Sequence, residues 1–188
     1  MTNRSGFTLL ECLIVLAVIA LLSSLAAPSL ARLVARNKAY DYTNRLYASL
    51  HFARDYAISN SVRIVICKTR GGTHCRRSGD WSEGWLIFED TDHNADCVDS
   101  NGDRRCDADN GRILRIGDGF GDGRYALFGN AHIANRVWFD PSGFANGSNG
   151  TFSLCRDQAG KTVPVEGIVV SNPGRTRVTR DTKRLSCS

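Results

Sequence analysis

A run of cationic side chains near the C-terminus is the clearest candidate for a binding site in this sequence. Arg175 and Arg177 flank a single threonine, follow Gly174, and are opposed by one nearby carboxylate, Asp181. Alternate residues of a strand face the same side, so the two arginines are expected to point together, and Gly174 would let a polyanion backbone approach closely. Such cations neutralise phosphates without reading base sequence, which predicts salt-dependent DNA binding. The candidate DNA-binding residues are Gly174, Arg175, Arg177, Arg180, Lys183 and Arg184.

The charge distribution also favours a polyanionic partner. Residues 89–110 hold eight carboxylates and two arginines, a net charge of −6, in a chain whose net charge is +5. The rest of the chain is therefore strongly basic, although net charge by itself determines solubility and steering rather than function. Few aromatic residues flank the cationic run, so base stacking is not implied and duplex DNA fits as well as single strands. A solvated strand on any basic protein would carry similar residues, and that alternative stays open.

The acidic segment offers oxygen ligands of the kind that a hard cation requires. Oxygen-bearing side chains recur there at alternate positions, in two successive sets. Neither set is a complete EF-hand loop, because Ala95 replaces the turn glycine of the first and neither has a glutamate at its twelfth position. Calcium binding and an ordinary solvated acidic surface both remain open. The candidate calcium ligands are Asp90, Asp92, Asn94, Asp96, Asp99, Asn101 and Asp103.

The cysteines indicate an oxidising compartment. Cys12 lies in an apolar run and is expected to be an inert small residue, which leaves six cysteines without any Cys-x-x-Cys spacing. That pattern favours disulfides over zinc. Six cysteines allow several connectivities, and the most economical one joins each cysteine to its neighbour in the sequence. The other connectivities remain open. The neighbour pairs are Cys67–Cys75, Cys97–Cys106 and Cys155–Cys187.

Enzymatic chemistry has little support in the sequence. The four histidines are scattered, and the sequence contains no nucleophile elbow, metal-binding helix motif or phosphate-binding loop. We therefore expect a protein that is not an enzyme and that needs no cofactor, with calcium as the one candidate. The histidines are His51, His74, His93 and His132.

An apolar run near the N-terminus must position the rest of the chain. Residues 7–28 are apolar except for two serines, a threonine and the single charge of Glu11. A helix of that length would extend about 33 Å, enough to cross a hydrocarbon core of about 30 Å. A carboxylate inside a membrane helix costs at least about 2.5 kcal/mol, so it is normally there for a partner. A signal peptide is a poor alternative, because at Ala26-Ala27-Pro28 a proline stands where the mature chain would begin.

The same stretch closely resembles the N-terminus of type IV prepilins: a short polar leader, a glycine, then Phe-Thr-Leu-Leu-Glu and an apolar helix. The resemblance implies that a prepilin peptidase cuts between Gly6 and Phe7 and methylates Phe7. It also implies that Glu11 neutralises the N-terminal amine of a neighbouring subunit. The expected location is a single pass of the inner membrane with a periplasmic head, followed by the pilus filament at the cell surface. The expected partners are other major and minor pilins, the inner-membrane assembly machinery and prepilin peptidase.

Helical periodicity continues past Pro28 to about Asn60, so the proline is expected to kink the helix rather than to end it. Period-two, β-branched segments follow, which predicts an α+β head in which the helix packs on an antiparallel sheet. The expected organisation is a leader at 1–6, a transmembrane half-helix at 7–28 and a pilin head at 29–188. The expected strands lie at 61–67, 83–90, 112–116, 124–128, 136–140, 151–155, 166–171 and 175–180, with the sixth and seventh paired as a hairpin.

The head resembles the GspH/FimT family of minor pilins and pseudopilins, with FimT-like or FimU-like members as the nearest types. The segments that carry the resemblance are 84–90, 139–143 with 150–155, and 167–171 with 174–178. FimT-like minor pilins bind DNA through a C-terminal Gly-Arg-x-Arg motif, which Gly174, Arg175 and Arg177 match. The resemblance thus implies a minor pilin that binds DNA for uptake in natural transformation. The alternatives are a structural minor pilin of the pilus-initiating tip complex and a pseudopilin of type II secretion, neither with a DNA role.

Overall fold

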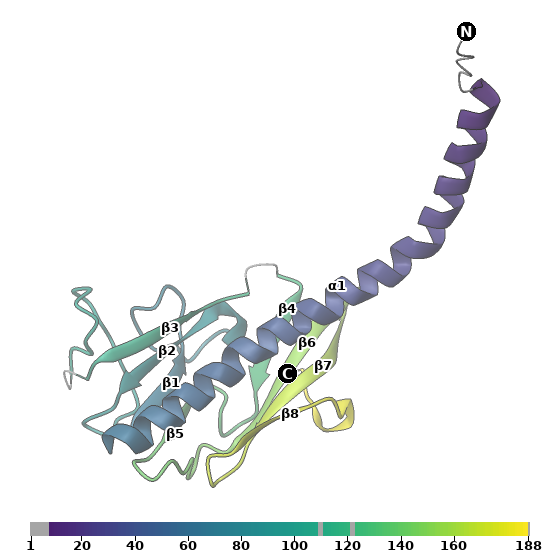
Figure 1. The fold of residues 1–188 in the computed structure, drawn as a ribbon. Helices are drawn as coiled ribbons and strands as arrows, with labels where there is room; N and C mark the ends of the chain where they lie inside the picture. The colour runs from purple at the N-terminus through teal and green to yellow at the C-terminus, as the bar shows by residue number, and fades with distance from the viewer. Residues whose placement is uncertain (1–7, 109–110, 121–122, 188) are drawn as a thin grey trace. The chain divides into compact units, whose positions relative to one another are not determined.

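The computed structural model describes residues 8–108, 111–120 and 123–187, apart from the side chains of residues 25, 26 and 28. One long helix is followed by two four-stranded antiparallel sheets (Figure 1). The chain divides into two compact units, Met1–Tyr40 and Asp41–Ser188. The predicted α+β class is confirmed, but the head contains two sheets where the sequence predicted one.

The helix α1 (Leu9–Asn60) begins directly after Thr8, whose hydroxyl accepts a hydrogen bond of 3.2 Å from the backbone N–H of Glu11. It continues without a break through position 28, as predicted. The apolar side chains from Leu9 to Leu22 are exposed. Within the described residues no single helix has the length and hydropathy of a membrane span, although Leu9–Ser24 and Ser29–Asn60 meet those criteria as a bent pair.

In the second unit, α1 buries one stripe of side chains against both sheets. Leu46, Leu50, Ala53 and Ala57 are fully buried, and their spacing follows the helical repeat. The indole N–H of Trp85 donates to the Ser49 hydroxyl at 2.9 Å. The helix therefore forms the layer on which the sheets are assembled.

The first sheet has the strand order β3-β2-β1-β5. Its strands are β1 (Ile64–Lys68), β2 (Gly84–Glu89), β3 (Ile113–Asp118) and β5 (Arg136–Phe139). Every residue of β1 is buried. Val65 and Cys67 pack into a cluster with the disulfide-bearing segments, so both faces of this strand are covered.

The second sheet has the order β4-β6-β7-β8, which leaves β8 at its edge. Its strands are β4 (Tyr125–Gly129), β6 (Gly150–Gln158), β7 (Lys161–Val170) and β8 (Thr176–Thr179). The predicted pairing of the sixth and seventh strands is confirmed. Two short 3-10 helices, η1 (Trp81–Glu83) and η2 (Thr182–Arg184), complete the head. Trp81 of η1 packs edge-on against Phe152 at 5.0 Å between ring centroids.

Candidate nucleic-acid interface

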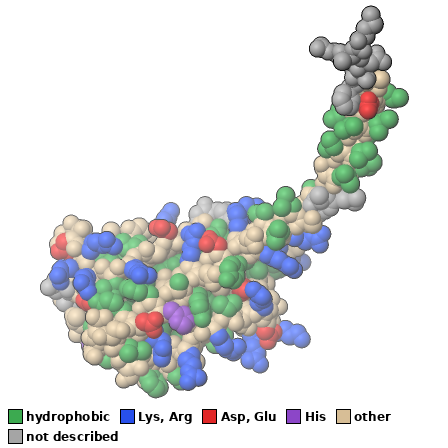
Figure 2. Space-filling view, in the orientation of Figure 1, with side chains coloured by type: hydrophobic (Ala, Val, Ile, Leu, Met, Phe, Trp, Pro, Cys, Tyr) green, Lys and Arg blue, Asp and Glu red, His purple; other side chains and the backbone are tan. Residues whose placement is uncertain are grey.

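The candidate DNA-binding arginines lie at the exposed edge of the second sheet. Arg177 is the register partner of Val169 in β7, and Arg175 directly precedes β8. Thr176, between them, faces α1, because its hydroxyl lies 2.7 Å from Nε2 of His51. Side chains alternate along a strand, so Arg175 and Arg177 point away from the helix. Both arginines are exposed, and Figure 2 shows Lys and Arg side chains along the part of the head where β8 runs.

Gly174 has a structural role that the sequence did not reveal. It is buried with a φ of +73°, and a Cβ atom added there would lie 1.8 Å from the carbonyl oxygen of Gly143. Arg54 of α1 donates to that same carbonyl at 3.1 Å and to the carbonyl of Pro173 at 3.5 Å. On the side where a Cβ atom would lie, the protein itself therefore fills the space next to Gly174.

Two of the predicted cations are paired with carboxylates. Arg180 Nε lies 3.0 Å from Glu166 Oε1, and the Glu166 side chain is only 6% exposed. Arg184 forms a longer ion pair of 3.5 Å with Asp181, between exposed side chains. The side chains of Arg175, Arg177 and Lys183 form no ion pair with any residue that the structure describes. The cationic surface available to a polyanion is therefore narrower than the sequence predicted.

Arg180→Ala should lower the free energy of unfolding by about 1–2 kcal/mol, because it leaves the buried Glu166 carboxylate without its ion pair. Arg184→Ala is the matched control and should change it by less than about 0.5 kcal/mol, since its ion pair is exposed. The measurement is urea unfolding of the full chain in detergent micelles at neutral pH. Adding Glu166→Gln to Arg180→Ala should recover part of the loss. Equal effects of the two arginine variants would contradict the assignment.

His51, one of the four scattered histidines, has a structural contact that its place in the sequence does not indicate. Its ring packs at a tilt against that of Tyr47, with 4.4 Å between ring centroids, and its contact with Thr176 joins α1 to β8. Together with Arg54 it fixes the segment that carries Arg175 and Arg177. His51 and Thr176 are 125 positions apart, so no local pattern in the sequence could have indicated their contact.

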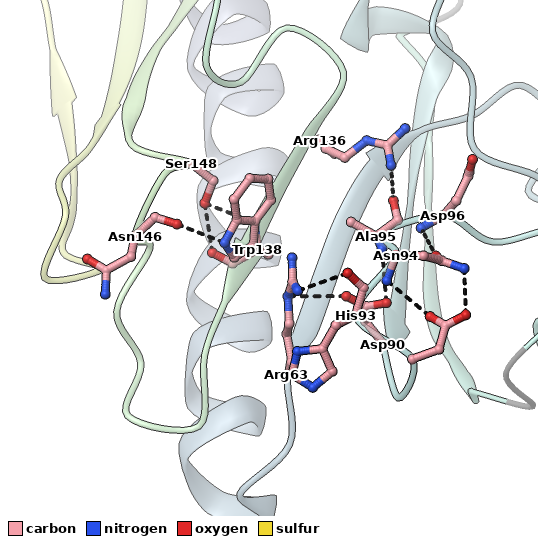
Figure 3. Close-up of polar contacts among 11 residues, drawn as sticks. Arg63, Asp90, His93, Asn94, Ala95, Asp96, Arg136, Trp138, Asn146 and Ser148 are labelled. Atoms are coloured by element: carbon pink, nitrogen blue, oxygen red, sulfur yellow. Dashed lines mark hydrogen bonds and ion pairs between the residues drawn. The ribbon is translucent and has the colours of Figure 1, made fainter.

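The first half of the acidic segment is organised around an ion pair rather than around a metal site (Figure 3). Asp90 is buried, and its Oδ2 lies 3.1 Å from Nε of Arg63, whose guanidinium stacks over the Trp138 ring at 5.1 Å. The other oxygen of Asp90 accepts the backbone N–H of Ala95 at 3.1 Å. Arg136 donates to the carbonyl of Ala95. Two arginines thus hold this loop against the first sheet.

In the second half of the acidic segment, side-chain oxygens also accept backbone N–H groups of the segment itself, as Asp90 does in the first half. Asp99 accepts N–H groups of Gly102 at 2.7 Å and Arg104 at 3.1 Å, and Asn101 accepts that of Asp103 at 3.0 Å. The described residues contain no group of three or more His, Cys, Asp or Glu side chains placed to hold a metal ion. The structure therefore does not bring the candidate calcium ligands together as a metal site.

Three disulfides join the cysteines as pairs of neighbours, Cys67–Cys75, Cys97–Cys106 and Cys155–Cys187. The first two fasten the acidic segment, because the Cys75 backbone N–H also donates to the carbonyl of Cys97 at 2.9 Å. The third attaches the C-terminal tail to β6. Cys12 is a free thiol on the exposed surface of α1.

A polar cluster fixes the end of α1 to the first sheet. The Tyr56 hydroxyl donates to Glu89 Oε1 at 2.7 Å, and Arg112 contacts both side chains. The hydrogen bond with the Glu89 carboxylate, aided by burial, raises the pKa of Tyr56. The cluster therefore keeps a neutral phenol beside an ion pair, which suits a structural role rather than proton transfer.

The N-terminal candidates fall in two regions. Gly6 and Phe7 lie outside the described residues, whereas Glu11 is exposed in the first turn of α1. A single carboxylate at the start of a long apolar helix, which continues into a helix-on-sheet head, defines a pilin-type protein.

Comparison with known families identifies the pilin family to which the chain belongs. The model described as "Type II transport protein GspH" matches residues 42–174, and the "Prokaryotic N-terminal methylation motif" matches residues 1–27. The chain belongs to the GspH family, a family of minor pilins and pseudopilins.

Solved structures agree on the fold. Two crystal structures of the type IV minor pilin FimU from Pseudomonas aeruginosa strain PAO1 are similar to this chain at 19% sequence identity. One covers 81% of this chain and 96% of its own, with a TM-score of 0.56; the other covers 79% and 98%, with 0.51. None of the curated proteins matches the chain in sequence.

Proposed function

We propose that this protein is a minor pilin of a type IV pilus that binds DNA without sequence preference, for uptake in natural transformation. The observation that carries the proposal is the pair Arg175 and Arg177, which is exposed at a sheet edge and free of ion pairs within the described residues. Guanidinium groups in that state can bind phosphates without first giving up a carboxylate. Lys183 adds a third exposed cation on the same C-terminal arm, which we define as residues 174–184.

The assembly part of the proposal concerns the N-terminus. Residues 1–6 would be a leader that prepilin peptidase removes before methylating Phe7, and residues 7–28 would lie in the inner membrane below a periplasmic head formed by 29–188. Glu11 would neutralise the N-terminal amine of a neighbouring pilin as the inner-membrane machinery adds the subunit to the filament. The match to the N-terminal methylation motif supports this arrangement.

A second candidate is a structural subunit without a DNA role, either in the tip complex that initiates a pilus or as a pseudopilin of type II secretion. The fold shared with FimU, a type IV minor pilin, and the family description as a type II transport protein favour it. The two candidates differ in what Arg175 and Arg177 do. They therefore predict opposite effects of removing those arginines on DNA binding and on assembly.

Arg175→Ala combined with Arg177→Ala should weaken DNA binding on the order of tenfold or more at low salt. The slope of log affinity against log salt should become shallower by about 1–2, because two phosphate contacts are lost. The measurement is fluorescence anisotropy with duplexes of two unrelated sequences, using the full chain in detergent micelles at several salt concentrations.

The matched control is Arg70→Ala combined with Arg104→Ala, which removes the same charge from two exposed arginines outside β8. It should leave the affinity nearly unchanged. Equal losses from both double variants would mean that net charge alone drives binding. Undetectable binding by the unmodified protein at low salt would leave the structural candidate.

A further inference from the structure

A cleft lies where the end of β1 in the first sheet meets β4 of the second. Its volume is about 380 Å³, within the range of about 300–1,000 Å³ that small-ligand sites occupy. Lys68 and Trp81 are buried lining residues, and Arg77 and Asn130 are exposed ones. None of the lining residues lies in β8.

Lys68 is the unusual residue of the cleft, since a lysine is rarely as little as 5% exposed. Its ammonium donates to the carbonyl of Gly79 at 2.7 Å and, weakly, to that of Arg77 at 3.5 Å. An ammonium has three N–H groups, and Lys68 has no further acceptor among the described residues. Burial lowers the pKa of Lys68, although Asp80 and Glu83 act in the opposite direction. An anion in the cleft would relieve that penalty.

The other polar groups of the cleft also favour an acceptor as the ligand. The side chains of Arg77, Asn130 and Asn135 form no hydrogen bond or ion pair with any described residue. Oδ1 of Asp80 already accepts the N–H groups of Ser82 at 2.7 Å and Leu127 at 3.3 Å, which leaves Oδ2 as the acceptor of that carboxylate that is still open among the described residues. Among the side chains that line the cleft, N–H donors without a partner therefore outnumber acceptors without a partner.

The remaining walls combine apolar surfaces with one carboxylate, Asp80. Phe128 lines the cleft, and the indole N–H of Trp81 is occupied by the carbonyls of Ile133 and Ala134 at 3.2 Å each. Asp80 disfavours a ligand of high negative charge. A single carboxylate on a short apolar stem matches these walls better than a phosphate dianion.

We propose that this cleft binds a carboxylate, with Lys68 and Arg77 as its cationic partners and Trp81 and Phe128 against its stem. A free organic acid and a glutamate side chain on a neighbouring protein share this chemistry. The site is independent of DNA binding, because none of its residues lies in the C-terminal arm.

The test is an NMR titration of the isotope-labelled full chain in detergent micelles with N-acetyl-glutamate-N-methylamide. Its uncharged glutamine analogue, acetate and inorganic phosphate serve as comparison probes. The glutamate probe should saturate one site with shifts at Lys68, Trp81 and Asn135, and bind about tenfold more tightly than the glutamine analogue. It should also raise the pKa of Lys68, measured from the pH dependence of its Cε resonance. Acetate binding as tightly as the glutamate probe would identify a free acid, and weaker acetate binding would identify a glutamate-bearing partner.

Lys68→Met replaces the ammonium with an unbranched, uncharged side chain one atom shorter and should weaken binding of the glutamate probe by about tenfold or more. Arg77→Ala should weaken it less, and Arg70→Ala, an exposed arginine outside the cleft, should not. Equal binding of the glutamine analogue, tighter binding of phosphate, or an unchanged pKa of Lys68 in the unmodified protein would each overturn the proposal. The wild-type measurements decide the matter even if Lys68→Met does not fold.

Discussion

Gly174→Ala is expected to lower the free energy of unfolding by about 2–5 kcal/mol. A left-handed φ contributes about 1–2 kcal/mol for a residue with a Cβ atom, and a forced shift of packed backbone contributes about 1–3 kcal/mol more. Both apply here, because φ is +73° and the added carbon would lie 1.8 Å from a backbone oxygen of Gly143. Arg54 would also have to move, since its Nε is 2.8 Å from the same point. Urea unfolding of the full chain in detergent micelles measures the change.

Gly160→Ala separates the two contributions. Its φ of +79° carries the same backbone strain, but no atom lies within 4 Å of the added carbon. It should cost only about 1–2 kcal/mol, and the difference between the variants is the cost of the collision with Gly143. A Gly174→Ala protein that is as stable as Gly160→Ala but has lost DNA affinity would support the view that this glycine serves a polyanion.

The elements of the fold could be predicted from local patterns. The stripe that includes Leu46 and Leu50 predicted the helix, and alternation with turn residues predicted eight strands. Two of them are longer than predicted, since β6 continues to Gln158 and β7 begins at Lys161. The division into two sheets could not be predicted. It depends on which strands pair, and β1 finds its second neighbour in β5, about 70 residues later, through contacts such as Ile64 with Phe139. Periodicity identifies a buried face but not the element that covers it.

The cationic arm shows the same limit at the level of single residues. The sequence identified Arg175 through Arg184 as cations and found Asp181 as their neighbour. It could not show that Glu166, 14 residues earlier, is the carboxylate that binds Arg180. The bulge in the pairing of β6 with β7 lies where Leu154 meets Glu166, and only the folded sheet places that buried side chain beside Arg180. Charge counted along the chain therefore overestimates the free charge of a folded surface.

The acidic segment illustrates a different reason. Alternating Asp and Asn residues suit a hard cation, yet the same spacing suits side chains that accept their own backbone N–H groups in tight turns. The structure follows the second option at Asp99 and Asn101. Sequence spacing does not distinguish the two because both place an oxygen at every other residue. The buried Arg63–Asp90 pair, which fixes the loop, joins positions 27 apart.

Removal of the Cys155–Cys187 disulfide is the second change with a large expected effect. Cys155→Ala combined with Cys187→Ala should lower the free energy of unfolding by about 3–4 kcal/mol, because the bond spans 32 residues and restricts the unfolded chain accordingly. Without it the tail keeps only a few contacts, such as the Ser186 N–H to the Ser153 hydroxyl at 3.2 Å. The measurement is urea unfolding of the full chain in detergent micelles, combined with amide hydrogen exchange.

Two controls locate the effect. Cys12→Ala removes a free thiol and should leave stability unchanged. Cys67→Ala combined with Cys75→Ala opens a span of only 8 residues and should cost about 2–3 kcal/mol. Exchange should rise first at Leu185 and along β8 in the Cys155/Cys187 variant, while β1 and β2 stay protected. If the arm at Arg175 and Arg177 kept its protection, the contacts of His51 and Arg54, rather than the disulfide, would be what holds the proposed DNA-binding strand in place.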